Sequence, residues 1–229
     1  MKIKKLDLNE FFSVLETIPY VLVKKSKSFP DYHTGQDADI FCYNKREVVR
    51  KILGVGNGYL SDGYVIKTEG ISPDHCQVDF VHNNVLVFKF DIFTAFPEYE
   101  KLSIKNHYFN SIIEGAVGVK CKFRDKKYHL YVPSSVDDLL IRYFEYLEYY
   151  DRRPDKLKHL DYILNAIEKT GKMRIGFFDK LHIYTEFPES NMSTSRYKYG
   201  FKIKNFLHWL VPLRKRFESL KHSMKFFFK

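Results

Sequence analysis

Two extended runs joined by a pair of asparagines constrain the fold of this chain most strongly. Residues 75–82 and 85–93 are rich in apolar side chains, and Asn83-Asn84 lie between them. Asparagine tolerates the left-handed backbone conformation that a tight two-residue hairpin requires. The segment therefore predicts a β-hairpin within a sheet, and other elements must cover that sheet.

Helical periodicity supplies candidates for the covering elements. Residues 8–18 carry apolar side chains at helical spacing before Pro19, and residues 45–53 follow Asn44, a favourable N-cap, with Gly54 as the expected C-cap. Short strands are expected at 20–24, 37–43 and 64–67, a helix near 105–114, and a second hairpin at 117–123 and 128–132.

The pattern becomes helical after residue 133. Ser135 and Asp138 form an expected capping box at the start of a helix, and Pro154 opens a second helix that runs to Gly171. We therefore predict an α+β fold, with a mixed sheet flanked by helices and a helical C-terminal part. The expected domains are a sheet-containing domain at 1–132, a helical subdomain at 133–188 and a basic amphipathic tail at 189–229.

Composition and charge limit the class of protein. Hydrophobic residues make up 45% and aromatic residues 17%, which is the profile of a folded chain. The three cysteines have no metal-binding or redox spacing, and no run of 18 apolar residues exists, so we expect a cytoplasmic protein. Residues 196–229 hold ten Lys or Arg and one acid, and so account for +9 of the net charge of +10. This distribution argues against a general nucleic-acid-binding face.

Two aspartates at the start of an expected strand are the main candidates for chemistry. Asp37 and Asp39 are two residues apart, so their side chains point to the same side of the strand. Adjacent carboxylates repel unless a cation lies between them, and Mg²⁺ (or Mn²⁺) binds carboxylate and phosphate oxygens together. Such a site serves phosphoryl or nucleotidyl transfer.

The context of this pair resembles the polymerase-beta-like nucleotidyltransferase superfamily. The family pattern is a Gly-Ser pair, about ten residues, then Asp-hydrophobic-Asp-hydrophobic, then a further strand aspartate. Residues 19–93 follow this order. The resemblance therefore implies that the mixed sheet is nucleotidyltransferase-like and that residues 1–132 form a catalytic domain. The resemblance implies that Asp37 and Asp39 bind metal and that Asp91 supplies the third catalytic carboxylate, with Asp79 as the competing candidate.

The resemblance also assigns Lys24, Lys25, Ser26 and Gly35 to nucleotide binding. Lys25-Ser26 stands where the family has Gly-Ser, so the hydroxyl is kept and the glycine is lost. A backbone without that glycine cannot approach phosphates as closely. Either the neighbouring lysines replace backbone contacts with charge, or the donor differs.

Within the superfamily, the strings Tyr-Val-Leu-Val-Lys and Gly-Gln-Asp-Ala-Asp-Ile are similar to bacterial members associated with surface polysaccharide synthesis. This similarity implies a nucleoside triphosphate or nucleotide-sugar donor and a sugar, polyol or lipid-linked saccharide acceptor. Two alternatives remain: a glycosyltransferase with an Asp-x-Asp motif, and an inactive nucleotidyltransferase-fold module recruited to membranes. The glycosyltransferase is the weaker one, because its motif typically ends a strand.

The basic tail suggests a location at a membrane. From Pro212 onward, apolar residues fall on one helical face and basic residues on others. A basic amphipathic helix can lie in the interface of an anionic membrane. We expect residues 205–229 to contact such a surface, which would make the protein peripheral on the inner face of the cell membrane. Docking of this helix on the domain or on a second subunit is the alternative.

Overall fold

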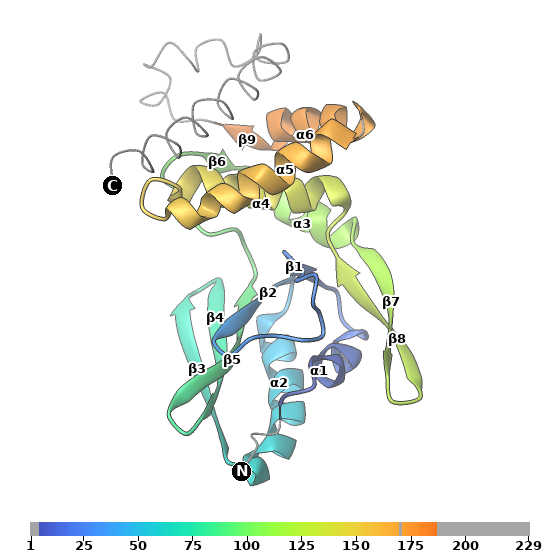
Figure 1. Cartoon of the computed structure of the whole chain (residues 1–229), viewed down its shortest axis with the longest axis vertical. Coiled ribbons are helices and arrows are strands. Elements are labelled where there is room, and N and C mark those ends of the chain that lie inside the picture. Colours follow the sequence, from blue (N-terminus) through green and yellow to red (C-terminus); the bar gives the residue numbers. More distant parts are fainter. Residues whose placement is uncertain (1–4, 170, 187–229) are drawn as a thin grey trace, which may run out of the picture. The chain divides into compact units, whose positions relative to one another are not determined.

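The computed structural model describes residues 5–169 and 171–186 (Figure 1). The basic tail expected at 189–229, and with it the expected membrane-binding helix, lies outside these residues. The chain divides into two compact units. Unit 1 comprises Met1–Glu98 and Ile104–Arg142, and unit 2 comprises Tyr99–Ser103 and Tyr143–Lys229. The division therefore falls inside a helix, beyond the boundary expected after residue 132.

A five-stranded mixed sheet forms the centre of unit 1. Its spatial order is β1 (Tyr20–Val23), β2 (Gln36–Cys42), β5 (Val85–Phe93), β4 (His75–His82) and β3 (Tyr64–Ser72). Strands β2 and β5 run parallel, whereas the other neighbouring pairs are antiparallel. With its flanking helices, this sheet confirms the α+β class and the mixed sheet that the sequence predicts.

The turn between β4 and β5 has the geometry expected for two asparagines. Asn83 and Asn84 have φ angles of 50° and 61°. Both values lie in the left-handed region, where asparagine is tolerated better than most residues, and two such residues in succession match a type I′ hairpin. The predicted hairpin is thereby confirmed: it pairs His82 with Val85 and Val81 with Leu86, and a bulge then shifts the register so that Phe80 pairs with Phe88.

Helices α1 (Leu8–Leu15) and α2 (Lys45–Gly56) supply the apolar side chains that cover one face of the sheet. Phe11 of α1 is fully buried, and its ring centroid lies 5.2 Å from those of both Phe80 and Phe90. Because side chains alternate along a strand, the residues next to Phe80 on β4 and next to Phe90 on β5 point to the opposite face of the sheet. The core on the helical face consists of residues such as Leu8, Phe12, Leu15, Ile40, Val48, Ile52, Phe88 and Ile92.

The predicted end of α2 was wrong. Gly54 lies inside the helix, which runs to Gly56 and continues as a 3-10 segment, η1 (Asn57–Asp62), to a left-handed Gly63 with φ 84°. The continuation buries Tyr59, whose ring stacks on Phe11 and whose hydroxyl donates to Glu10 at 2.9 Å. This packing outweighs the tendency of an early glycine to end the helix.

The cap of α4 (Ser135–Tyr149) lies one residue earlier than predicted. The Ser134 hydroxyl accepts from the Asp137 backbone N–H at 3.3 Å, and Asp137 in turn accepts from that hydroxyl. Asp138 instead forms an ion pair with Arg142 at 2.9 Å. Asp137 is buried and also accepts from the Tyr108 hydroxyl at 2.7 Å, which ties the start of α4 to helix α3 (Asn106–Glu114).

The remaining elements largely follow the predicted order. The second predicted hairpin is confirmed as β7 (Val117–Phe123) and β8 (Lys126–Val132). Unit 2 contains η2 (Pro154–Lys156) with α5 (Leu157–Lys169), then α6 (Gly171–Tyr184); the strands β6 (Ser103–Ile104) and β9 (Thr185–Glu186) pair with each other. Among the helices of the described residues, none combines the length and apolar character needed to cross a bilayer.

Candidate metal centre

Asp37 and Asp39 lie on the sheet face opposite α1 and α2. Along β2 their side chains alternate with the buried Ala38 and Ile40, which point toward the core. Both carboxylates therefore project from the same side of the strand, as the sequence pattern predicts. The side chain of Asp39 is 15% exposed, and Asp37 is an exposed residue.

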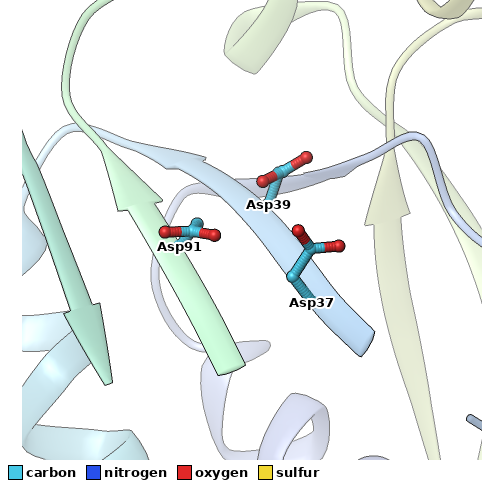
Figure 2. A group of neighbouring side chains, drawn as sticks. All are labelled: Asp37, Asp39 and Asp91. Atoms are coloured by element: carbon cyan, nitrogen blue, oxygen red, sulfur yellow. The ribbon is translucent and has the colours of Figure 1, made fainter. Parts of the chain in front are cut away.

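Asp91 reaches the same place from the neighbouring strand. In the parallel pairing of β2 and β5, Asp39 is the direct partner of Asp91. Asp37, Asp39 and Asp91, here called the aspartate triad, lie side by side (Figure 2), and one carboxylate oxygen from each lies within 4.8 Å of those from the other two. Asp91 is 5% exposed, and it is the innermost of the three.

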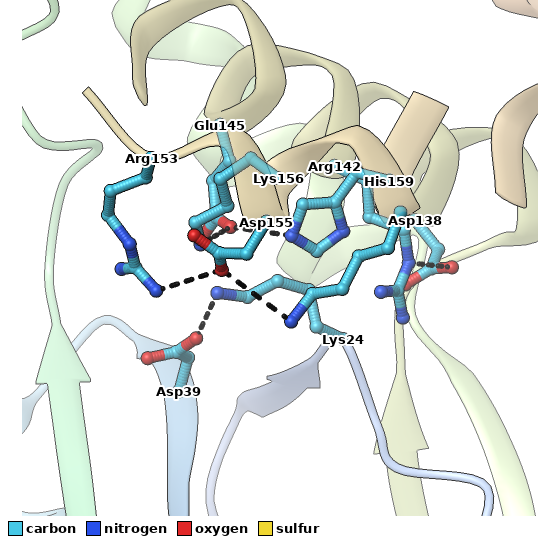
Figure 3. Close-up of polar contacts among 10 residues, drawn as sticks. Lys24, Asp39, Asp138, Arg142, Glu145, Arg153, Asp155, Lys156 and His159 are labelled. Carbon is cyan, nitrogen blue, oxygen red and sulfur yellow. Dashed lines mark hydrogen bonds and ion pairs between the residues drawn. The ribbon is translucent and has the colours of Figure 1, made fainter. Parts of the chain in front are cut away.

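Two lysines balance part of the charge on the triad. The Lys24 ammonium forms an ion pair with Asp39 (Figure 3), and Lys89 Nζ lies 2.7 Å from Asp91 Oδ2. Burial by itself lowers the pKa of Lys89, but the hydrogen bond with Asp91 and the charges of the triad outweigh it and raise the pKa. Lys89 is therefore a firmly charged part of the cluster.

His75 holds the second oxygen of Asp91. Its Nε2 lies 2.9 Å from Asp91 Oδ1, and because an ionised carboxylate only accepts, Nε2 carries the proton. The ring stacks on Phe93, with centroids 4.1 Å apart and planes 14° apart. Asp91 is thus fixed between Lys89 and His75, which orients it toward β2.

Asp79, the competing candidate for the third carboxylate, lies outside the triad. It sits on β4 opposite Lys89, one strand further from β2 than Asp91. Its Oδ1 is buried without a hydrogen-bond partner among the described residues. Burial is the main reason why the pKa of Asp79 is raised, and the positive charge of Lys89 offsets only part of that effect.

The raised pKa of Asp79 predicts how a variant changes stability with pH. When the pKa of a carboxyl is higher in the folded chain than in the unfolded chain, the group stabilises the fold at pH values below its unfolded pKa, which is about 3.9. This stabilisation is lost as the pH rises through the folded pKa. We expect Asp79→Asn to raise the free energy of unfolding by about 1 kcal/mol at pH 7 and to leave it unchanged at pH 3. Urea unfolding at both pH values measures this. A loss of stability at pH 7 would instead mean that Lys89 stabilises the ionised form.

The donor set of the triad suits a hard divalent cation. All three ligands are carboxylate oxygens, which Mg²⁺ and Mn²⁺ prefer. Ligands on opposite sides of Mg²⁺ lie about 4.2 Å apart, so small side-chain rotations bring the three oxygens to one ion. Lys24 and Lys89 compensate two of the three negative charges. A divalent cation would make the cluster positive and able to attract phosphate.

The loop residues expected to bind nucleotide differ in their contacts. Lys24 reaches the triad. Lys25 Nζ donates to the Ser26 carbonyl at 3.3 Å, and the Ser26 hydroxyl lies 2.7 Å from that of Ser28 and accepts from the Ser28 N–H at 3.2 Å. Gly35 has φ 81°, and its N–H donates to the Val87 carbonyl at 3.1 Å. That backbone donor anchors the loop to β5.

Sequence reasoning missed Lys89 and His75 as parts of the site. The signal for Lys89 was present, because a residue two positions before Asp91 on a strand shares its face. His75 lies at the start of β4 opposite Phe93, so only the register of the hairpin brings it beside Asp91.

Comparison of the chain with models of protein families, with curated proteins and with solved structures found no match.

Proposed function

We propose that this protein is a divalent-metal-dependent nucleotidyl or phosphoryl transferase with the polymerase-beta-like nucleotidyltransferase fold. One observation carries the proposal. The Asp-x-Asp pair on β2 and Asp91 on the adjacent parallel strand β5 place three carboxylates within 4.8 Å, on the sheet face away from the covering helices. Three carboxylates at such spacing are tolerated when cations lie among them, and the two lysines present supply fewer charges than the triad carries.

Each residue of the cluster has a distinct task in this proposal. Asp37 and Asp39 hold the ion, which when bound neutralises charge on the phosphates of the donor. Asp91 completes the ligand set and polarises the acceptor hydroxyl. His75 and Lys89 keep the Asp91 carboxylate oriented, as groups hydrogen-bonded to metal ligands commonly do. Lys24 contributes positive charge where phosphate would arrive.

The proposed substrates follow from the family resemblance of the sequence. The donor is a nucleoside triphosphate, and the acceptor is a sugar, polyol or lipid-linked saccharide used in bacterial surface polysaccharide synthesis. A glycosyltransferase with an Asp-x-Asp motif is less well supported, because β2 begins at Gln36 and the motif therefore opens the strand. An inactive module is supported by Lys25-Ser26 in place of the family's Gly-Ser pair, and by the hydrogen bonds of the Ser26 hydroxyl to Ser28, which occupy the group expected to meet phosphate.

Isothermal titration calorimetry tests the proposed function. With Mg²⁺ or Mn²⁺ present, the unaltered chain is expected to bind a nucleoside triphosphate, and Asp39→Ala is expected to bind it at least tenfold more weakly because a metal ligand is lost. Asp79→Asn is the matched control, since Asp79 lies on the same sheet outside the triad, and it should stay within about threefold of the unaltered chain. Identical binding by the unaltered chain and Asp39→Ala would contradict the proposal.

A further inference from the structure

The Lys24 ammonium pairs with a carboxylate oxygen of Asp39, one of the groups that a metal ion at the triad would bind. Lys24 directly follows β1, where Val23 is the register partner of Asp39. Its backbone has φ 54°, in the left-handed region that few non-glycine residues adopt, and this turn starts the loop to β2. The side chains of Lys24 and Asp39 are only 19% and 15% exposed, so little water screens their ion pair.

We propose that Lys24 is a built-in counter-ion that the divalent cation displaces from Asp39, and that the displaced ammonium then binds the phosphates of the donor. The inference rests on the proposed function and adds a mechanism that couples its two ligands. The ion and the ammonium are both positive and share one carboxylate. Binding of the ion therefore weakens the Lys24–Asp39 pair.

Lys24 is the lysine that can move, and Lys89 is not. Lys89 lies in the middle of β5, between β2 and β4, with Asp37 and Asp79 as its register partners. Whatever happens at Asp39, Lys89 keeps acidic neighbours on both sides. Lys24 lies at the end of an edge strand and at the start of a loop. A change in its side-chain direction leaves the pairing of the sheet intact.

Displacement of Lys24 makes metal and phosphate binding cooperative. An ammonium that leaves Asp39 in a partly buried site gains from pairing with an incoming anion, and a triphosphate is such an anion. The phosphate thus favours the state in which Asp39 is open to metal. By linkage, the ion must favour phosphate binding by the same factor.

Two titrations on the full chain test this inference. We expect Lys24→Met to bind Mn²⁺ about tenfold more tightly than the unaltered chain when no phosphate is present, measured by electron paramagnetic resonance of free Mn²⁺. In saturating Mg²⁺, the same variant is expected to bind inorganic tripolyphosphate about tenfold more weakly by calorimetry. Opposite changes in one variant cannot arise from general damage to the fold.

Lys51→Met is the matched control, because it removes the same charge from helix α2 on the opposite face of the sheet, where the Lys51 ammonium donates to the Thr17 hydroxyl at 2.8 Å. Both of its affinities should stay within about threefold. Unchanged or weaker Mn²⁺ binding by Lys24→Met would overturn the inference. If Asp91→Asn still loses Mn²⁺ in that case, the proposed function stands. Absence of Mn²⁺ binding in the unaltered chain would overturn both proposals.

Discussion

Asp91→Asn is expected to lower the affinity for Mn²⁺ about a hundredfold or more. Asparagine keeps the shape of the side chain and an oxygen that accepts from His75, but it removes the negative charge at the innermost position of the triad. Loss of a group that only orients a ligand already costs about 10- to 100-fold in metal affinity, so loss of a charged ligand should cost at least as much. Electron paramagnetic resonance of free Mn²⁺ measures the affinity directly.

Asp79→Asn distinguishes loss of a ligand from a general loss of negative charge. Asp79 also faces Lys89, on the other side of β5 from Asp37. Its replacement removes the same charge from the same sheet, so we expect only about a threefold fall in Mn²⁺ affinity. If the Asp79 variant lost the ion and the Asp91 variant kept it, Asp79 would be the third ligand, and the assignment of Asp91 would be wrong.

Phe90→Ala is expected to lower the free energy of unfolding by about 3–5 kcal/mol. Phe90 is fully buried on the helical side of β5, between the two site residues Lys89 and Asp91. Its ring packs at centroid distances of 5.1 to 6.2 Å against four others, namely Phe11, Phe12, Phe80 and Phe88. Alanine would leave a cavity beneath the site. The expected loss is a large share of the total free energy of unfolding of a domain.

Urea unfolding followed by circular dichroism measures this loss, with Val85→Ala as the control. Val85 starts the same strand and is 53% exposed, so its truncation should change stability by less than about 0.5 kcal/mol. A loss below about 1 kcal/mol in Phe90→Ala would show that the aromatic cluster does not hold β5 in place. It would also remove the packing explanation for how Asp91 is positioned.

Local sequence signals predicted much of the fold of unit 1. The asparagine turn, the Asn44 cap and the apolar spacing of α1 each act within a few residues, so they can be recognised without knowledge of the tertiary structure. Asn44 accepts from the Glu47 N–H at 3.1 Å, as a capping side chain should. Elements whose stability comes from such short-range interactions were therefore found at nearly the right positions.

Tertiary contacts decided the features that were missed or misplaced. Strand β3 continues past Lys67 to Ser72, where exposed residues pair only with β4 and give no apolar signal. Helix α6 places its apolar residues on several sides, with Ile175 and Ile183 exposed, so no one-sided periodicity marked it as a helix. The extension of α2 depends on the burial of Tyr59 under α1, which no local pattern reveals.

The candidate site was predictable to the extent that it follows strand alternation. Asp37 and Asp39 share a face because they are two residues apart on one strand. The choice of Asp91 over Asp79 depended on which strand lies beside β2, and the only signal for it along the chain was the stronger apolar character of the Asp91 strand. The pairing of Asp39 with Asp91, and the contacts of Lys24 and His75, require the register of the assembled sheet.

The central claim is that the aspartate triad binds one divalent cation, and a crystal grown with Mn²⁺ tests it most directly. Anomalous scattering near the manganese edge locates the ion without reference to the protein. We expect a peak about 2.1–2.2 Å from carboxylate oxygens of Asp37, Asp39 and Asp91, with Lys24 turned away from Asp39. A triad still closed by Lys24 at saturating Mn²⁺, with no anomalous peak among the three carboxylates, would contradict it.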